Sequence, residues 1–129
     1  TTSGRVVAWG DDEYGECSRV PELPAGEAFA AVAAGTWYTA ALTTSGRVVV
    51  WGYDGYGECS RVPELLAGEA FVAVAAGDSH AAALTTSGRV VAWGCDFGGR
   101  CSRVPELSVG EAFAAVAAGF SHTAALTTS

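Results

Sequence analysis

Short apolar segments alternate along this chain with glycine-rich and polar turns. The first, residues 4–10, reads GRVVAWG, and its β-branched and aromatic side chains between two glycines predict a strand. Both faces of that strand are apolar, which is typical of a strand covered on both sides. A further strand is expected over residues 39–44, and the polar turn TTSG at 43–46 joins it to the next apolar run at 47–51. These two segments therefore predict a β-hairpin.

The whole pattern recurs with a period of 42 residues. The repeats cover residues 1–42, 43–84 and 85–126, residues 127–129 begin a fourth copy, and 30 of the 42 columns are identical in all three repeats. Self-similarity at this period indicates a repeat architecture, so residues 1–129 are interpreted as a single arc of repeats. Such identity indicates either recent duplication or deliberate design. The absence of Met indicates a chain that is processed, trimmed or excised from a longer repeat protein.

The columns that differ gather at the turns of the repeat. Eight of the twelve variable columns follow the Trp-Gly or Ala-Ala-Gly steps, and two more are at residues 24 and 25. A scaffold that is constant in its apolar positions and variable in its loops is typical of a binding surface. Neutral drift at exposed positions explains the same pattern equally well, so both interpretations stay open.

The Ala-rich segment 27–35, EAFAAVAAG, could form either a helix or a strand. Its alanines, and Gly35 as a C-terminal cap, favour a helix, but about 12 residues are needed for a helix that is stable without packing. As a strand, together with a short edge strand at 17–21 that ends in proline, it makes four strands per repeat and a propeller blade. As a helix it makes a solenoid with a parallel sheet. The strand count and the two-faced apolar strand favour an all-β propeller of four-stranded blades.

Net charge and hydropathy argue against several classes of function. Fourteen acidic residues against seven arginines give a formal charge of −7, which argues against binding to nucleic acid or to an anionic membrane. No apolar run reaches the roughly 18 residues that span a bilayer, and no basic segment precedes an apolar one as in a signal peptide. The sequence therefore predicts a soluble chain and leaves its compartment unknown.

The residues that could carry chemistry are better explained as structural. Ser79 and His80 are adjacent, so a strand would point them to opposite faces, and no nucleophile–base pair follows. No Cys or His spacing fits a metal site, no cofactor is implied, and the sequence predicts no catalytic residue and no enzyme. Small buried thiols are expected in the column of Cys17, Cys59 and Cys101, with a Cys95–Cys101 pair as the minor alternative. Structural ion pairs are expected between the repeated columns of Glu27, Glu69, Glu111 and of Arg5, Arg47, Arg89.

The repeat GRVVAWGDDEYGECSRVPELPAGEAFAAVAAGTWYTAAL resembles the repeats of the regulator-of-chromosome-condensation family. The shared marks are V-x-A-W-G, W-G-x-x-x-x-G, a later V-P, A-A-G-x-x-H and A-L. The match is closest to the short-repeat bacterial branch, which includes secreted beta-lactamase inhibitors. The resemblance implies a β-propeller with four-stranded blades and makes the Ala-rich run an inner strand. Family propellers commonly close with seven blades, whereas this chain holds three, and Tyr38 stands where His80 and His122 occupy the histidine position.

In the inhibitor branch, aromatic residues of the turns after A-A-G and W-G form the contact face. Carried onto this sequence, that implies a protein partner bound by Trp37, Tyr38, Tyr53, Tyr56, Phe97 and Phe120, with His80 and His122. Exposed aromatic residues at loop tips also suit such an anchor in physical terms.

Three blades make an arc whose two ends expose strand edges and apolar faces. The strand at 5–9 has its hairpin partner in a preceding repeat, and the strand at 123–126 has its partner in a following one. We therefore predict a head-to-tail homo-oligomer that closes the ring by strand pairing between chains. The residues expected to pair are Arg5, Val6, Val7, Ala8 and Trp9 of one chain with Thr123, Ala124, Ala125 and Leu126 of another. A homodimer with six blades is favoured, and a homotrimer with nine blades is next.

The sequence accordingly predicts a non-enzymatic repeat scaffold that self-assembles into a closed propeller, natural or engineered. The alternative is a protein-binding module such as an inhibitor of a secreted hydrolase. A small-ligand or enzyme site in the central channel would need polar groups on the innermost strand, and residues 29–34 offer none.

Overall fold

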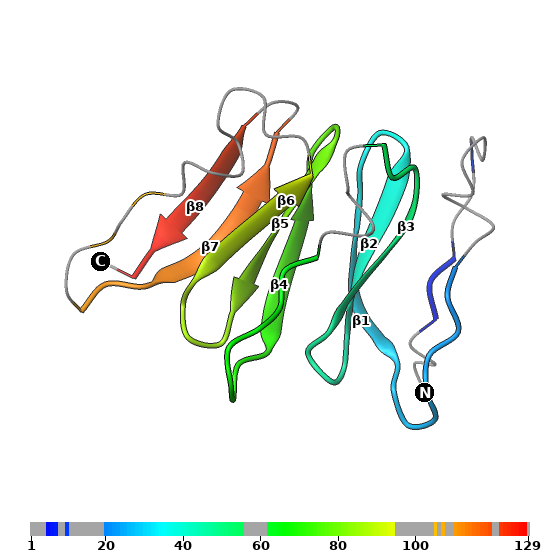
Figure 1. Ribbon diagram of the computed structural model, residues 1–129, viewed down its shortest axis with the longest axis horizontal. Coiled ribbons are helices and arrows are strands. Elements are labelled where there is room, and N and C mark those ends of the chain that lie inside the picture. The colour runs from blue at the N-terminus through cyan, green and yellow to red at the C-terminus, as the bar shows by residue number, and fades with distance from the viewer. Residues whose placement is uncertain are drawn as a thin grey trace.

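A computed structural model (Figure 1) describes residues 5–7, 10, 20–55, 62–94, 105, 107, 110–119 and 122–128. The strands are β1 (Phe29–Ala34), β2 (Tyr38–Thr43), β3 (Val48–Gly52), β4 (Phe71–Ala76), β5 (His80–Thr85), β6 (Val90–Gly94), β7 (Phe113–Ala118) and β8 (Thr123–Thr127). The all-β prediction is therefore confirmed for this part of the chain, and it contains no helix long and apolar enough to cross a membrane.

The strands form three antiparallel sheets that lie side by side (Figure 1). The order is β1-β2-β3 in the first sheet, β4-β5-β6 in the second and β7-β8 in the third. The third strand of each of the first two sheets belongs to the next 42-residue repeat, so these sheets cross the repeat boundary. The hairpin predicted there is confirmed, because Leu42 lies opposite Val48 and Tyr38 opposite Gly52.

The Ala-rich segments are strands because the hairpin that follows each of them supplies backbone partners. β1 pairs with β2 from Phe29 opposite Thr43 to Ala34 opposite Thr39, with an irregularity between Phe29 and Ala31. The same register and irregularity recur between β4 and β5 and between β7 and β8. The Ala-rich strands of neighbouring sheets also contact one another, β1 with β4 and β4 with β7. Small side chains allow this approach, as expected where propeller blades converge.

The TTSG turn links neighbouring sheets as well as neighbouring strands. The amide of Gly46 donates to the carbonyl of Thr43 over 3.1 Å, and Gly46 has a φ of +82°, which favours glycine. The carbonyl of Gly46 accepts a hydrogen bond from the amide of Phe71 over 2.8 Å, and Gly88 and Phe113 repeat this bond at 3.0 Å. Each turn thus ties its sheet to the next sheet along the chain.

The hydrophobic core lies between the first two sheets. Every residue of the middle strands β2 and β5 is buried. The buried cluster draws on both sheets, and its members are Tyr38, Leu42, Val48, Phe71, Ala81, Ala83 and Trp93. The packing of one sheet against the next therefore supplies most of the apolar burial that stabilises the arc.

Two predicted strands are not formed where the structure describes them. Residues 5–7, inside the strand predicted at 4–10, lie outside any strand. Their counterparts β3 and β6 are held by β2 and β5, and no described strand takes that place beside residues 5–7. Of the edge strand predicted at 17–21, only Val20 and Pro21 are described, and neither lies in a strand. The fourth strand of each blade therefore stays a prediction.

Candidate interaction surfaces

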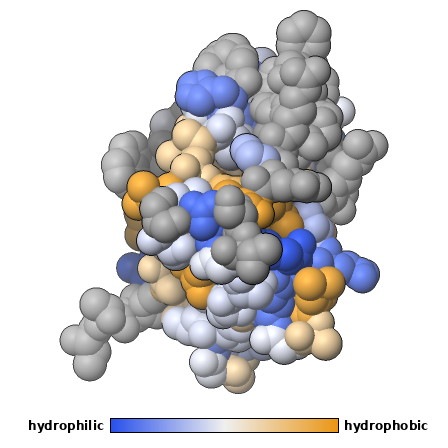
Figure 2. Space-filling view, turned by 90° about the vertical axis from the view of Figure 1, so that its left-hand side faces the viewer, coloured by the Kyte–Doolittle hydropathy of each residue, from blue (hydrophilic) through white to orange (hydrophobic). Residues whose placement is uncertain are grey.

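Among the described residues, one edge of β8 lacks the neighbour that the middle strand of the other sheets has. β2 lies between β1 and β3, and β5 lies between β4 and β6, whereas the described residues pair β8 with β7 alone. Leu126 is 65% exposed, whereas Leu42 and Leu84 in the same column of the repeat are 8% and 6% exposed. Figure 2 views the molecule from this end and shows apolar surface between polar residues. We call the uncovered side of β8 the open edge.

The chain carries a second copy of the segment that covers β5. Residues 4–10 are identical to residues 88–94, and the latter segment contains β6. β6 pairs with β5 so that His80 lies opposite Gly94 and Leu84 opposite Val90. In the same register on β8, Gly10 would lie opposite His122 and Val6 opposite Leu126. The turn after β8 is also in place, because the amide of Thr128 donates to the carbonyl of Ala112 over 2.9 Å, as Thr44 and Thr86 do in the other sheets.

A hollow of about 320 Å³ lies beside the N-terminal segment. Its walls include Val6 and Phe29. In the next repeat their counterparts, Val48 and Phe71, belong to the same buried cluster as Leu42. The hollow therefore has the lining that surrounds a leucine of the Leu42 column elsewhere in the fold.

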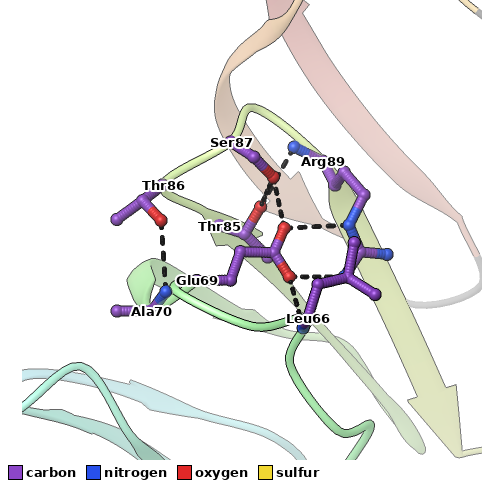
Figure 3. A network of polar contacts seen from close by, with 7 residues as sticks. All are labelled: Leu66, Glu69, Ala70, Thr85, Thr86, Ser87 and Arg89. Atoms are coloured by element: carbon purple, nitrogen blue, oxygen red, sulfur yellow. Dashed lines mark hydrogen bonds and ion pairs between the residues drawn. The ribbon is translucent and has the colours of Figure 1, made fainter.

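A buried carboxylate network fixes the turn before β6 (Figure 3). Glu69 Oε1 lies 2.7 Å from Arg89 Nη2, Glu69 Oε2 accepts from Arg89 Nε over 2.9 Å, and the Ser87 hydroxyl donates to the same carboxylate. The amide of Leu66 donates to Oε1 over 2.9 Å. Ion pairs were predicted for the Glu and Arg columns of all three repeats, and two of them are confirmed: Glu69 with Arg89, and Glu27 with Arg47. Ser45 donates to Glu27 as Ser87 does to Glu69.

Hydrogen bonds from Arg89 and Ser87 hold the pKa of the Glu69 carboxyl well below its ordinary value of 4.5. Arg47 and Ser45 lower the pKa of Glu27 in the same way. Because the pKa of the folded state lies below that of the unfolded state, these carboxylates stabilise the fold above about pH 4.5, and the contribution is lost as the pH falls.

Tyr38 and His80 join neighbouring sheets and do not form an exposed contact face. Tyr38 is 1% exposed, and its hydroxyl donates to the carbonyls of Gly77, over 3.1 Å, and of His80. His80 is fully buried, and its Nε2 lies 3.0 Å from Thr123 Oγ1. Both side chains, which were predicted to bind a partner, are therefore buried in the folded chain. The reason is the Ala-Ala-Gly turn, where a Cβ on Gly77 would clash with the His80 ring, so the ring lies folded over the glycine.

The other predicted contact residues have different surroundings. Trp37 is 39% exposed and packs edge-on against the half-buried Tyr53, with ring centroids 5.6 Å apart. His122 is exposed and directly precedes β8. The remaining aromatic positions, all four cysteines and two of the pairing residues lie outside the described residues; they are Tyr56, Phe97, Phe120, Cys17, Cys59, Cys95, Cys101, Ala8 and Trp9.

A shallow hollow of about 340 Å³ lies where the Ala-rich strands of the three sheets end. It is lined by the Ala-Ala-Gly steps of the three repeats, together with Thr36 and Asp78. The Thr36 hydroxyl donates to the Asp78 carboxylate of the next repeat. No group of three or more His, Cys, Asp or Glu side chains that could hold a metal ion occurs among the residues placed by the structure. Trp37 directly follows Thr36, so the exposed Trp37 and the half-buried Tyr53 that packs against it lie on the rim of this hollow. We call these two residues the aromatic rim.

Comparison with known proteins assigns the repeat. Residues 29–58 and 71–100 match the sequence profile of the regulator of chromosome condensation (RCC1) repeat. These two segments are therefore RCC1-like repeats. Comparison with curated protein sequences finds no match.

Solved structures share the fold of these RCC1-like repeats. They include the ectodomain of the receptor kinase CR4 from Physcomitrella patens (TM-score 0.73, 24% identity, covering 98% of this chain and 34% of that one). Prp20p from Saccharomyces cerevisiae matches with a TM-score of 0.74 at 17% identity, covering 94% of this chain and 39% of its own. Yeast RCC1 (Prp20) bound to Kap60 matches with a TM-score of 0.68 at 21% identity, covering 95% and 37%. This chain thus spans between about a third and two fifths of the length of these structures.

Sequence reasoning missed two residues that hold the RCC1-like repeats together. Ser87 lies between Glu69 and Arg89 in the network, and Thr123 contacts His80 from the next sheet. The role of Ser87 had a signal in the sequence, because Glu, Ser and Arg keep the same spacing in the repeats. The contact of Thr123 with His80 had no signal within a single repeat, because the two residues lie 43 positions apart.

Replacing Glu69 with Gln is expected to flatten the acid limb of the stability profile. The variant keeps the size of the side chain but loses the group that titrates, so its thermal midpoint falls less steeply below about pH 4.5 than that of the parent chain. Thermal melts recorded from pH 7 to pH 3 measure this slope. Glu64→Gln, at an exposed glutamate, is the matched control and keeps the parent profile. Identical slopes in all three chains would contradict the assignment.

Proposed function

We propose that this chain is a non-enzymatic repeat scaffold that closes into a propeller by pairing with copies of itself. The observation that carries the proposal is the open edge. The segment GRVVAWG covers β5 in the second sheet, and an identical segment stands at residues 4–10 without a described strand beside it. A strand added to an exposed sheet edge gains main-chain hydrogen bonds, while its side chains set the register.

The apolar contacts of the closed ring favour the same arrangement. With the strand of a second copy on β8, Leu126 would enter the hollow beside Val6 and Phe29, as Leu42 packs with Val48 and Phe71. Burial of a leucine side chain that is 65% exposed contributes about 1–2 kcal/mol per junction. Each protomer offers one open edge and one strand, so the contact is head-to-tail and can close into a ring. Two chains give six blades and three give nine, and the smaller ring is preferred.

Substituting Leu126 with Asp is expected to leave a folded single protomer. The side chain is 65% exposed in the single chain, so the fold tolerates a carboxylate there. In the ring the carboxylate would be placed in an apolar hollow, which costs several kcal/mol. Sedimentation velocity compares the two chains across concentrations.

Leu66→Asp is the matched control, because Leu66 is 60% exposed on a turn outside the open edge. It is expected to assemble as the parent chain does. If Leu126→Asp assembles as tightly as Leu66→Asp, the open edge is not the contact between copies.

A second function is favoured by the aromatic rim, which presents Trp37 against Tyr53 beside the mouth formed by the Ala-rich strands. Exposed tryptophans of this kind are frequent anchors in protein interfaces. Among the similar structures, Prp20p is a protein with binding properties toward Gsp1p and histones, and yeast RCC1 is seen bound to Kap60. We propose that the aromatic rim binds a protein partner, with a secreted hydrolase such as a beta-lactamase as the first class to test.

The substitution Trp37→Ala is expected to weaken binding of the partner at least tenfold while leaving self-assembly unchanged. A panel of beta-lactamases, probed for binding and for inhibition by the parent chain, supplies the measurement. Leu66→Ala, which removes an exposed apolar side chain elsewhere, is the control. Absence of binding to every member of the panel would remove the hydrolase class, and equal binding by both variants would remove the rim.

A further inference from the structure

We propose that the two ends of the junction between copies are closed by Glu111 and His122 of one copy, which contact Arg5 and Thr39 of the second copy. The inference rests on the proposed self-assembly and adds to it the residues that meet at the junction. It assigns these residues to a site that is complete only when two copies meet.

The ion pair at the first end follows from the carboxylate networks. At the two boundaries inside the chain, Glu27 binds Arg47 and Glu69 binds Arg89. In each case the arginine directly precedes the strand that covers β2 or β5. Glu111 stands in the same column of the third repeat. The arginine that precedes a GRVVAWG strand on the open edge is Arg5 of the second copy, and Arg5 is exposed in the single chain.

The contact at the other end follows from a pairing across the junctions between sheets. At the first junction the aromatic side chain is Tyr38. Its hydroxyl donates to backbone carbonyls of the second repeat, and Ala81 lies in the same buried cluster. At the second junction the aromatic side chain is His80. It is shorter than tyrosine and forms a hydrogen bond with the hydroxyl of Thr123 instead. Across these two junctions, a tyrosine in one repeat thus goes with an alanine in the next repeat, and a histidine goes with a threonine.

The third junction can be completed in the same way by the first repeat of a second copy. In the third repeat the aromatic side chain at this position is His122. The column that holds Ala81 in the second repeat and Thr123 in the third holds Thr39 in the first. The side chain of Thr39 lies on β2 and is 8% exposed. The second repeat of another copy would present Ala81 and leave the imidazole without a hydroxyl. A head-to-tail order, which brings the first repeat of the second copy to the open edge, therefore supplies the hydroxyl that His122 needs.

A charge exchange tests the first end. Arg5→Glu alone and Glu111→Arg alone are each expected to raise the dissociation constant of the assembly at least tenfold, and the chain carrying both changes is expected to recover it. Glu64→Arg makes the same charge change at an exposed glutamate and keeps the parent affinity. Thermal melts in dilute solution, where protomers are separate, show whether any variant acts by unfolding.

An exchange of side chains tests the other end. His122→Tyr places a phenol against Thr39 and is expected to weaken assembly at least tenfold, whereas His122→Tyr with Thr39→Ala reproduces the first junction and restores it. A parent chain that stays a single protomer overturns both this inference and the proposed self-assembly. A parent chain that assembles, but whose single variants match it or whose paired variants fail to recover, overturns this inference alone.

Discussion

A chain that lacks residues 1–10 is expected to remain a single protomer under conditions in which the full chain assembles. The deletion removes the GRVVAWG segment that the open edge would accept, and with it a ladder like that of the five residue pairs between β5 and β6. The eight strands that the structure describes lie outside the deletion, so each described sheet keeps its own hydrogen bonds. Sedimentation velocity of the two chains side by side gives the result, and circular dichroism checks that the shorter chain is still β.

A synthetic peptide of residues 1–10 is expected to bind the shortened chain with one peptide per protomer. The same peptide with Val7→Pro is the control, because proline cannot donate to a strand ladder. Isothermal titration of both peptides compares them directly. Equal binding of the two peptides, or assembly of the shortened chain into the oligomer that the full chain forms, would show that residues 1–10 are not the donated strand.

Gly77→Ala is expected to lower the free energy of unfolding by about 3 kcal/mol, at the upper end for overpacking a buried site. A Cβ at this position would clash with the ring of His80 and would lie 2.6 Å from the carbonyl oxygen of Gly119. Neither neighbour can easily move, since His80 is fully buried and bonded to Thr123, and Gly119 contributes backbone. Urea titration followed by tryptophan fluorescence measures the loss.

The matched control for this prediction is Gly119→Ala in the same column. There the nearest atoms to an added Cβ all belong to His122, which is exposed and can turn away. The loss is expected to stay below about 1 kcal/mol when both substitutions are made in the Leu126→Asp chain, which keeps protomers separate. Equal losses at Gly77 and Gly119 would contradict the packing described for the junction between sheets.

Much of the fold could be predicted from the sequence because each hairpin joins two segments that are neighbours along the chain. The TTSG turn and the flanking β-branched residues are local signals, and they place β2 and β3 correctly. The Ala-rich run could not be assigned from propensity, since alanine favours a helix in isolation. Its backbone finds partners in β2, and this contact, which the family resemblance anticipates, overrides the local preference.

The candidate site was harder to predict because its contacts join different repeats. Tyr38 and His80 occupy variable loop columns, which suggested exposure, yet each lies buried against the sheet of the following repeat. A repeat considered alone shows neither the sheet beyond it nor the carbonyls that it presents. The strand predicted at residues 4–10 differs from β6 for the same reason, because a strand needs a neighbour and residues 5–7 have none among the described strands.

Native mass spectrometry of the 129-residue chain tests the central claim most directly. A protomer has a mass of 13.1 kDa, so a closed ring of two chains is predicted at about 26 kDa, and a ring of three at about 39 kDa. Closure of the ring predicts one of these masses as a single discrete species. A folded β protein that stays at 13.1 kDa at high concentration would contradict it.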